Sequence, residues 1–443
     1  MLKQEENELI TRVGPGTPMG NFMREYWLPA LLSSELPTPD SDPLRVLLLG
    51  EKLIAFRDTN GKVGLMDHNC PHRGASLFLA RNEECGLRCV YHGWKFDADG
   101  NCIDMPNEPA ESDFKTKVKA TAYPTQERGG IVWAYMGPRS TPPPLPDLEG
   151  NMADSSAEGV RAFQLEGNWL QILEGDIDTS HVGFLHYGGL RAEDQPPGSF
   201  SELQLRQKPV DIEVIDTEGG AAYGAKRPAD QGQEYWRIAQ YCFPFYTFTP
   251  PGVLGLVKSN GARVPMDDHH TMNFFMTAGR RMPLPTINGK PAPLANAFPQ
   301  PLPRTTDWYG RFRMDQNLAN DFKIDREVQR TGVGGQGYTG IPGLAMQDAA
   351  VTGSMGPVMD RTHEHLGSAD AMVIRVRRRI IAAVQAHVRT GAVPPGVDDP
   401  EVYRVRSGGT FLPSGADWVE STRELRRAFV EHPELDPALN GPL

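Results

Sequence analysis

The stretch that decides the fold reads CPHRGASL at residues 70–77 and CVYHGWKFD at residues 89–97. Each half supplies one thiolate and one imidazole from a glycine-containing turn, so the four candidate metal ligands are Cys70, His72, Cys89 and His92. A [2Fe–2S] cluster with two Cys on one iron and two His on the other needs this pairing. Zinc is the alternative, but zinc sites favour C-x2–4-C and H-x3–5-H halves, and both halves here are mixed. The spacing therefore predicts an iron–sulfur cluster.

Short apolar runs surround this motif and indicate where the domains begin and end. From Arg45 the runs RVLLLG, KLIAFRD and VGLMD are separated by Gly-Glu and Asn-Gly turns, which is typical of β-hairpins. A Pro-rich break, TPPPLPDLEG, follows at residues 141–150. We expect three parts: an N-terminal segment (1–43) that packs with the catalytic domain, a cluster domain (44–150) and a catalytic domain (151–443). We also expect helices at Pro18–Trp27 and Asp370–Arg389, strands within 200–280 and a loop at 283–305.

A second set of candidate ligands lies in GNWLQILEGDIDTSHVGFLHYG at residues 167–188. A helix is expected over Trp169–Leu185, on which Asp178 and His181 would share a face. His186 follows further on, so the helix must end or bend near Gly183. Two His and one carboxylate on one face of an iron leave positions open for O2 and substrate. The alternative is a set of unrelated polar residues on an amphipathic helix.

These motifs, with the opening TRVGPGTPMGNFMREYWLPALLSSEL at residues 11–36, resemble the aromatic ring-hydroxylating Rieske oxygenases. The opening is similar to the phthalate dioxygenase branch of that family. The resemblance implies an α+β fold, in which an antiparallel β Rieske [2Fe–2S] domain precedes a helix-grip catalytic domain, an antiparallel sheet covered by helices. The matching motifs cover most of the chain and are weakest at residues 280–330.

The resemblance also implies the remaining ligand of a mononuclear Fe²⁺ held by His181 and His186. Asp348, in GLAMQDAAVTGSMGP, matches the family's Gln-Asp ligand position. Asp325, Asp360 and Asp370 are the alternatives, and Asp360 fits a structural salt bridge or N-cap better. Gly353 stands where many relatives carry Glu, which leaves the local helix geometry open.

In the family, Asp178 links the two metal sites across a subunit boundary. It would hydrogen-bond His181 and approach His92 of the partner subunit, so the resemblance implies a homotrimer or a stacked hexamer. The plainer alternative is that Asp178 only orients His181.

The bulk composition limits the partners. The 443 residues carry a net charge of −11, and the pI is about 5.5, which argues against nucleic acid and an anionic membrane surface. The N-terminus has neither the basic start nor the apolar core of a signal peptide, so we expect a cytoplasmic protein. Five Cys in a chain of this length do not form a disulfide framework, and Cys85, Cys102 and Cys242 are expected to be ordinary thiols.

The expected function is hydroxylation of an aromatic, carboxylated substrate of the phthalate or benzoate class with O2. O-demethylation of an aryl methyl ether or a biaryl lignin-type acid is the alternative, and a Rieske electron carrier without oxygenase activity is a third possibility. GVGGQG at residues 332–337 matches G-x-G-x-x-G but follows no buried strand, so electrons should come from a separate NAD(P)H-dependent reductase. Lys226, Arg227 and Arg263 are candidates for binding a substrate carboxylate.

Overall fold

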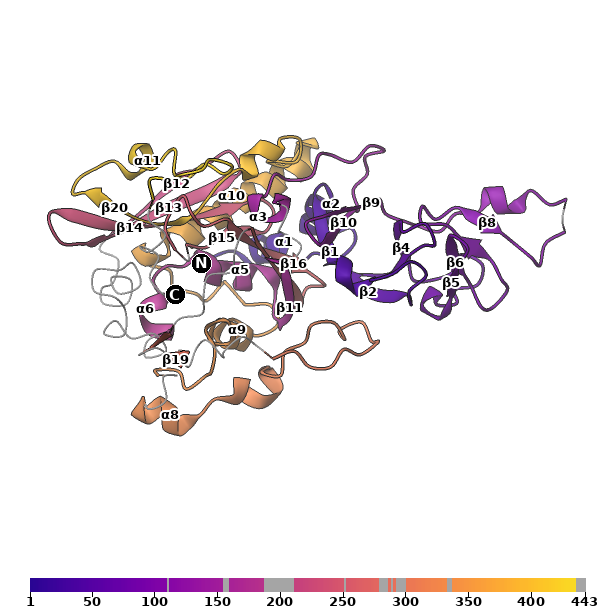
Figure 1. Cartoon of the computed structure of the whole chain (residues 1–443), viewed down its shortest axis with the longest axis horizontal. Coiled ribbons are helices and arrows are strands. Elements are labelled where there is room, and N and C mark those ends of the chain that lie inside the picture. The colour runs from indigo at the N-terminus through magenta and orange to yellow at the C-terminus, as the bar shows by residue number, and fades with distance from the viewer. Residues whose placement is uncertain are drawn as a thin grey trace.

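The computed structural model describes residues 1–109, 111–153, 159–186, 211–250, 252–278, 286–287, 290–291, 300–332 and 337–435. These residues form a small part and a large part, which lie at opposite ends of the long axis in Figure 1. The paired strands of both parts are antiparallel, so the predicted α+β class with antiparallel sheets is confirmed.

The small part consists of short hairpins. Its strands are β2 (Leu44–Leu48), β3 (Glu51–Arg57) and β4 (Val63–Asp67) in one sheet, and β5 (Arg81–Glu83), β6 (Gly86–Arg88), β7 (Lys95–Phe96) and β8 (Cys102–Asp104) in another. Leu49 and Gly50 join β2 to β3 with φ of 47° and 77°, as a tight hairpin turn requires. A separate buried cluster that includes Phe56, Leu77 and Phe96 forms the core of this part. The loops β4–β5 and β6–β7 carry the two halves of the first motif.

The large part is built on one eight-stranded sheet in the order β11-β17-β16-β15-β14-β13-β12, with β20 also paired to β14. The strands are β11 (Arg161–Glu166), β12 (Asp211–Asp216), β13 (Gly220–Pro228), β14 (Gln233–Cys242), β15 (Tyr246–Phe248), β16 (Ser259–Pro265), β17 (His270–Thr277) and β20 (Gly408–Pro413). Side chains alternate between the two faces of such a sheet. Tyr223 and Ala239 enter the main core on one face, whereas Trp236 stacks on Trp418 on the other.

The large part also contains helices. They are α3 (Glu149–Met152), α5 (Trp169–Ile177), α6 (Val182–Leu185), α8 (Arg326–Thr331), α9 (Leu344–Ser354), α10 (Ala371–Thr390) and α11 (Trp418–Ser421), with 3-10 turns η6 (Leu318–Lys323), η7 (Ser368–Asp370) and η8 (Pro400–Tyr403). The long helix α10 packs on β12 and β13, and α5 packs on β14 to β16. The start of α5 is held by Asn168, whose buried amide donates to the carbonyl oxygens of Thr11 and Asp268 at 2.9 and 2.8 Å.

The N-terminal segment is shared between the two parts. Its elements are α1 (Gln4–Thr11), α2 (Pro18–Arg24), β1 (Trp27–Leu32) and η1 (Ser33–Glu35), and the small part adds η2 (Leu77–Leu79) and η3 (Phe114–Lys117). Both α1 and α2 pack against α10 of the large part. β1 pairs with β10 (Ile131–Tyr135), which pairs with β9 (Thr125–Arg128), so a third small sheet joins the segment to the end of the small part.

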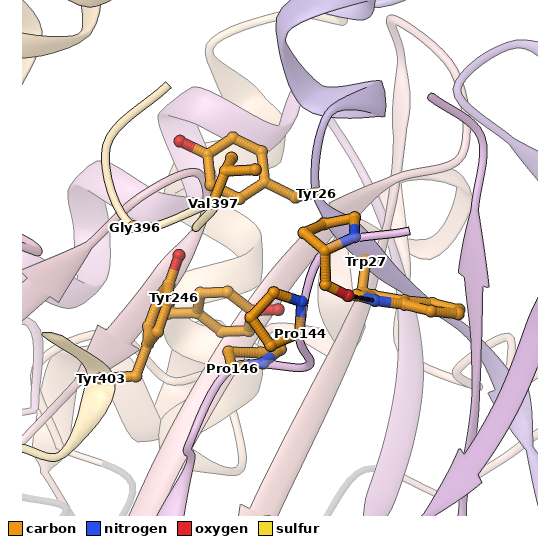
Figure 2. Close-up of a pocket in the computed structure, with 9 residues that line it drawn as sticks. Tyr26, Trp27, Pro144, Pro146, Tyr246, Gly396, Val397 and Tyr403 are labelled. Atoms are coloured by element: carbon orange, nitrogen blue, oxygen red, sulfur yellow. Dashed lines mark hydrogen bonds between the residues drawn. The ribbon is translucent and has the colours of Figure 1, made fainter. Parts of the chain in front are cut away.

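The Pro-rich break packs between the N-terminal segment and the C-terminal part of the chain. Figure 2 shows Tyr26, Trp27, Tyr246 and Tyr403 gathered around the prolines of this break. Trp27 Nε1 donates to the carbonyl oxygen of Pro143 at 2.7 Å. The cavity between these side chains measures about 10 Å³, which admits at most one water molecule. This junction is therefore structural, and the substrate must bind elsewhere.

The helix expected at residues 370–389 is confirmed by α10, and the helix at 18–27 gives way to β1 at Trp27. The predicted loop at 283–305 contains a short strand pair, β18 (Thr286–Ile287) with β19 (Lys290–Pro291), so that prediction was wrong for these residues. In the Gly-rich motif, Gly332 ends α8 with a left-handed conformation, and residues 333–336 lie outside the described residues. Within the described part of the chain, no helix combines the length and apolarity needed to cross a membrane.

Candidate active site

Two matching turns hold the first motif. The Gly74 N–H donates to the carbonyl oxygen of Cys70, and the Gly93 N–H donates to that of Cys89, both at 2.9 Å. Gly93 has φ of +79°, and a Cβ at this position would lie 2.5 Å from Pro106 Cγ. Glycine is therefore required for the second turn, which brings its Cys and His onto one loop.

The side chains of the four predicted cluster ligands come from these two loops. The rings of His72 and His92 have centroids 4.4 Å apart, and His72 stacks on Trp94 at 4.2 Å. His72 Nδ1 is buried without a hydrogen-bond partner, as expected of a nitrogen that ligates a metal. Burial raises the pKa of Cys70 to about 11, with a further contribution from Cys89, so a metal is needed to hold Cys70 as a thiolate. These residues fit a [2Fe–2S] cluster.

The second motif does not form the continuous helix that we expected. α5 ends at Ile177, and α6 begins at Val182, so the break lies at Asp178–His181 and not near Gly183. The N–H and the hydroxyl of Ser180 both donate to Asp178 Oδ1 at 2.7 Å. Such local side-chain bonds compete with the helical pattern and end the helix here.

The break brings three candidate iron ligands together. Nε2 of His181 and Nε2 of His186 lie 3.6 and 3.4 Å from Oδ1 of Asp348 on α9. The ligand atoms of all three residues lie within 4.8 Å of one another. Three atoms that each bind one ion at about 2 Å are about 3–4 Å apart, and two His with one carboxylate are a common Fe²⁺ ligand set. The geometry therefore fits the predicted mononuclear iron.

Both His present Nε2 to this site because Nδ1 is occupied on the other side of each ring. His181 Nδ1 lies 3.4 Å from Asp178 Oδ2, and His186 Nδ1 lies 2.8 Å from Oε1 of the buried Gln347. An acceptor at Nδ1 fixes the tautomer that leaves Nε2 free for a metal. The sequence analysis named Asp178 but missed Gln347, although Gln347 directly precedes Asp348.

The pKa shifts show that this site favours a positive charge. Burial by itself would lower the pKa of His186, but Asp348 and Gln347 outweigh it and raise that pKa. Burial would likewise raise the pKa of Asp178, but hydrogen bonds from His181 and Ser180 outweigh it, and the pKa is lowered. A cation bound at Nε2 of His186 would replace the proton that Asp348 and Gln347 favour on this ring.

The alternative carboxylates have structural roles. Asp325 caps α8 by accepting the N–H groups of Glu327 and Val328. Asp360 accepts the N–H and hydroxyl of Thr362, and Asp370 accepts the N–H of Gly367. The helix α9 continues through Gly353, where a Cβ would lie 3.2 Å from the carbonyl oxygen of Glu166. The missing Glu therefore allows α9 to lie close to β11.

Comparison with known proteins agrees with both metal sites. Residues 26–123 match the family model described as Rieske [2Fe-2S] domain, and residues 134–438 match the model LigXa C-terminal domain like. The chain belongs to the Rieske oxygenases, as their alpha (oxygenase) subunit. It is therefore the oxygenase subunit of an aromatic ring-hydroxylating enzyme, with a [2Fe–2S] cluster and a mononuclear iron at His181, His186 and Asp348.

Two curated relatives match this Rieske oxygenase over nearly its whole length. The 3-chlorobenzoate-3,4-dioxygenase oxygenase subunit of Comamonas testosteroni is 45% identical over 432 residues, covering 96% of this chain and 99% of the relative. The phthalate 4,5-dioxygenase oxygenase subunit of Pseudomonas putida is 39% identical, covering 94% of each. Among solved structures, dicamba monooxygenase bound to dicamba matches with a TM-score of 0.54 over 83% of this chain and 99% of that chain. At 17% identity, that structure supports the fold alone.

The three cationic side chains predicted to bind substrate lie in different places in this Rieske oxygenase. Lys226 Nζ lies 3.6 Å from the Asp211 carboxylate. Lys226 pairs with Trp236 in the β13–β14 register, so its side chain lies on the sheet face that α11 covers. Arg263 is 3% exposed and forms an ion pair with Asp176 at 2.6 Å. Arg227, next to Lys226, is buried on the opposite face of the sheet.

Arg237 was not among the candidates predicted from the sequence, but it contacts the segment that carries two of the iron ligands. Arg237 is 9% exposed and shares the sheet face of Arg227, and its Nη1 donates to Thr179 Oγ1 at 2.8 Å. Thr179 lies between Asp178 and His181. A charged residue inside the apolar strand sequence YWRIAQYC was the available signal, because such a residue must either be paired or serve a function.

Proposed function

We propose that this subunit hydroxylates an aromatic carboxylic acid of the benzoate or phthalate class. The cis-dihydroxylation consumes one arene, one O2, two electrons and two protons and gives one dihydrodiol, with the electrons supplied by a separate NAD(P)H-dependent reductase. When bound, the cluster supplies one-electron transfer and the mononuclear iron supplies O2 activation. The names of the 45% and 39% identical relatives, which specify 3-chlorobenzoate and phthalate, support this substrate class.

The observation that carries the proposal is the buried guanidinium of Arg237. Its Nε is buried and has no hydrogen-bond partner, and no carboxylate of the described chain lies within ion-pair distance of it. A buried cation without a counter-charge is costly, so an anionic ligand would stabilise it. Because Arg237 contacts Thr179 beside the iron ligands, a carboxylate bound there would hold an aromatic ring near the iron.

Arg227 lies on the same face of the sheet as Arg237. Burial, together with the charge of Arg237, lowers the pKa of Arg227 to about 10. Both side chains rise from the same face of β13 and β14, where Arg237 faces Ala225 and Arg227 faces Tyr235. Thr179 holds the Arg237 guanidinium in place for a substrate carboxylate.

The test compares an acid with its neutral amide. The variant Arg237→Ala would be assayed for reductase-coupled hydroxylation of 3-chlorobenzoate and 3-chlorobenzamide, with phthalate as a further acid. We expect kcat/KM for the acids to fall by about 10–150-fold, the equivalent of a charge-assisted hydrogen bond of about 1.5–3 kcal/mol. The amide should change by less than about threefold.

Lys226→Ala is the matched control, because it removes a cation from the neighbouring strand position on the other face of the sheet. Its kcat/KM for the acids should stay near that of the wild type. Equal losses for acid and amide in Arg237→Ala, or an equal loss of acid turnover in Lys226→Ala, would refute the proposed role of Arg237.

O-demethylation is the second candidate, supported by a relative from a Sphingobium species. The 5,5'-dehydrodivanillate O-demethylase oxygenase subunit is 31% identical over 423 residues, covering 91% of this chain and 88% of the relative. Demethylation of a methoxybenzoate would consume O2, two electrons and two protons and release formaldehyde, water and a phenol. One formaldehyde released for each O2 consumed would favour O-demethylation. A dihydrodiol product without formaldehyde would favour dihydroxylation of the aromatic acid.

We infer a homotrimer or stacked hexamer as the working assembly. In Figure 1, the sheet of β5 and β6 lies at the end of the molecule away from α6 and α9. Val90 and Tyr91, beside His92, are 58% and 53% exposed, and Phe184, between His181 and His186 in the chain, is 50% exposed. Exposed apolar side chains at both ends fit contacts between neighbouring subunits, in which Asp178 would approach His92 of the partner subunit. Light scattering that gives a monomer with full activity would refute this assembly.

A further inference from the structure

Gln171 on α5 is fully hydrogen-bonded where α5 meets the end of α9. Its side chain is 1% exposed, and its Nε2 donates to the carbonyl oxygens of Thr352 and Gly356, both at 2.8 Å. Its Oε1 accepts the N–H of Met359 at 2.9 Å. The last carbonyl groups of a helix lack partners within that helix. Gln171 therefore provides, from another helix, a cap for the C-terminal end of α9.

A further hydrogen bond connects this cap to the carboxylate ligand. The hydroxyl of Thr352 donates to the main-chain carbonyl of Asp348, one turn earlier in α9, at 2.8 Å. Thr352 thus accepts a hydrogen bond from Gln171 through its main-chain carbonyl and donates one to the Asp348 carbonyl through its hydroxyl. The result is a continuous path of hydrogen bonds from α5 to the backbone of the iron ligand.

The packing of α9 on its neighbours is close but mostly nonpolar. A Cβ at Gly175 would lie 3.5 Å from Thr352 Cγ2, and one at Gly353 would lie 3.2 Å from the Glu166 carbonyl oxygen. Such contacts resist closer approach, but they are non-directional and resist sliding along the helix axis weakly. The hydrogen bonds of Gln171 are directional, so they fix the position of α9 along its axis.

That position matters because the iron ligands come from two separate elements. His181 and His186 follow α5 in the chain, whereas Asp348 lies on α9. A metal site requires its ligands to be held within about 0.5 Å of the productive geometry. A shift of α9 relative to α5 would move Asp348 away from both His side chains.

We propose that Gln171 is a positioning residue of the iron site, which holds Asp348 at ligand distance from His181 and His186 through Thr352. Gln171 touches neither the ligands nor the substrate. Its role therefore differs from that of Gln347, which contacts His186 directly. The role is independent of which aromatic acid is bound, so it is tested without any substrate.

The test measures Fe²⁺ affinity in the full-length protein after selective removal of the mononuclear iron. The variants are Gln171→Leu, which removes all three hydrogen bonds, and Thr352→Val, which keeps the shape and removes the hydroxyl. Anaerobic titration with Fe²⁺ against a chromogenic chelator gives the dissociation constant, and the EPR signal of the reduced cluster reports that the small part is intact. We expect the dissociation constant to rise about 10–100-fold in Gln171→Leu, as for other residues that orient ligands, and several-fold in Thr352→Val.

Gln164→Leu is the matched control. Gln164 is also a buried glutamine, and its Nε2 also donates to two carbonyl oxygens, those of Tyr309 and Arg311, both at 3.1 Å. This variant should keep the wild-type Fe²⁺ affinity. Unchanged affinity in folded Gln171→Leu, or an equal loss in Gln164→Leu, would overturn the proposal. If Gln171→Leu does not fold, Thr352→Val decides, and wild-type affinity in that variant would overturn the proposal.

Discussion

Glu174→Gln should destabilise the large part of the protein by about 3–5 kcal/mol at pH 7. The Glu174 carboxylate on α5 is bound by Arg361 and Arg377, whose side chains are 0% and 4% exposed. Arg377 also contacts Glu364, so two arginines share two carboxylates in the interior. The variant would leave Arg361 without its carboxylate partner and Arg377 with Glu364 alone, and breaking a buried pair in this way costs about 3–5 kcal/mol.

The destabilisation caused by Glu174→Gln should depend on pH. Burial by itself would raise the pKa of Glu174, but Arg361 and Arg377 outweigh it, and the folded-state pKa falls below the ordinary value of 4.5. A group with a lowered folded pKa contributes fully above its unfolded pKa and loses that contribution as the pH falls through the folded value. The difference between wild type and variant should therefore be complete above pH 4.5 and shrink in stronger acid.

Urea unfolding followed by tryptophan fluorescence gives the free energy of unfolding, while visible absorption of the cluster reports on the small part. Glu420→Gln is the control, because Glu420 pairs with Arg423 on the surface with both side chains about two-thirds exposed. Such a pair is worth less than about 1 kcal/mol. A Glu174→Gln variant within 1 kcal/mol of the wild type at pH 7, or a deficit that does not shrink in acid, would refute the reasoning.

Three further predictions follow from single contacts. Gln347→Leu should weaken Fe²⁺ binding about 10–100-fold because His186 loses its Nδ1 partner, and equilibrium dialysis with Fe²⁺ would show this. Asp267 should contribute roughly 2 kcal/mol of stability that is lost as the pH falls from 4 to 2, because burial, which would raise its pKa, is outweighed by hydrogen bonds from His270 and its neighbours, which lower the pKa to about 2. In urea titrations over this pH range, Asp267→Asn should therefore lose roughly 2 kcal/mol less stability than the wild type. Cys102→Ser should keep the acid-labile sulfide content of the wild type, because Cys102 is not one of the proposed cluster ligands. A lower sulfide content in this variant would indicate that this buried thiol does ligate the cluster.

The four proposed cluster ligands could be chosen from the sequence because each pair lies on one short loop. Cys70 and His72 lie on one hairpin loop, and Cys89 and His92 lie on another. The Gly residue that closes each turn follows the His of that turn within two residues. The helix break near His181 was harder to place. The glycine at position 183 suggested a break there, whereas the side chain of Asp178 ends the helix earlier by binding Ser180.

Two residues that could not be predicted from the sequence, Arg237 and Gln171, depend on strand register or on the packing of one helix against another. Arg227 and Arg237 belong to one surface only because β13 and β14 pair in a register that places Ala225 opposite Arg237. A shift of that register by one residue would turn Arg237 to the other face and put Trp236 beside Thr179. No local pattern encodes this register, since it is set by packing on both faces of the sheet. The substrate specificity that we propose for Arg237 is therefore a property of the sheet, whereas the candidate metal ligands lie on two short loops, one broken helix and α9.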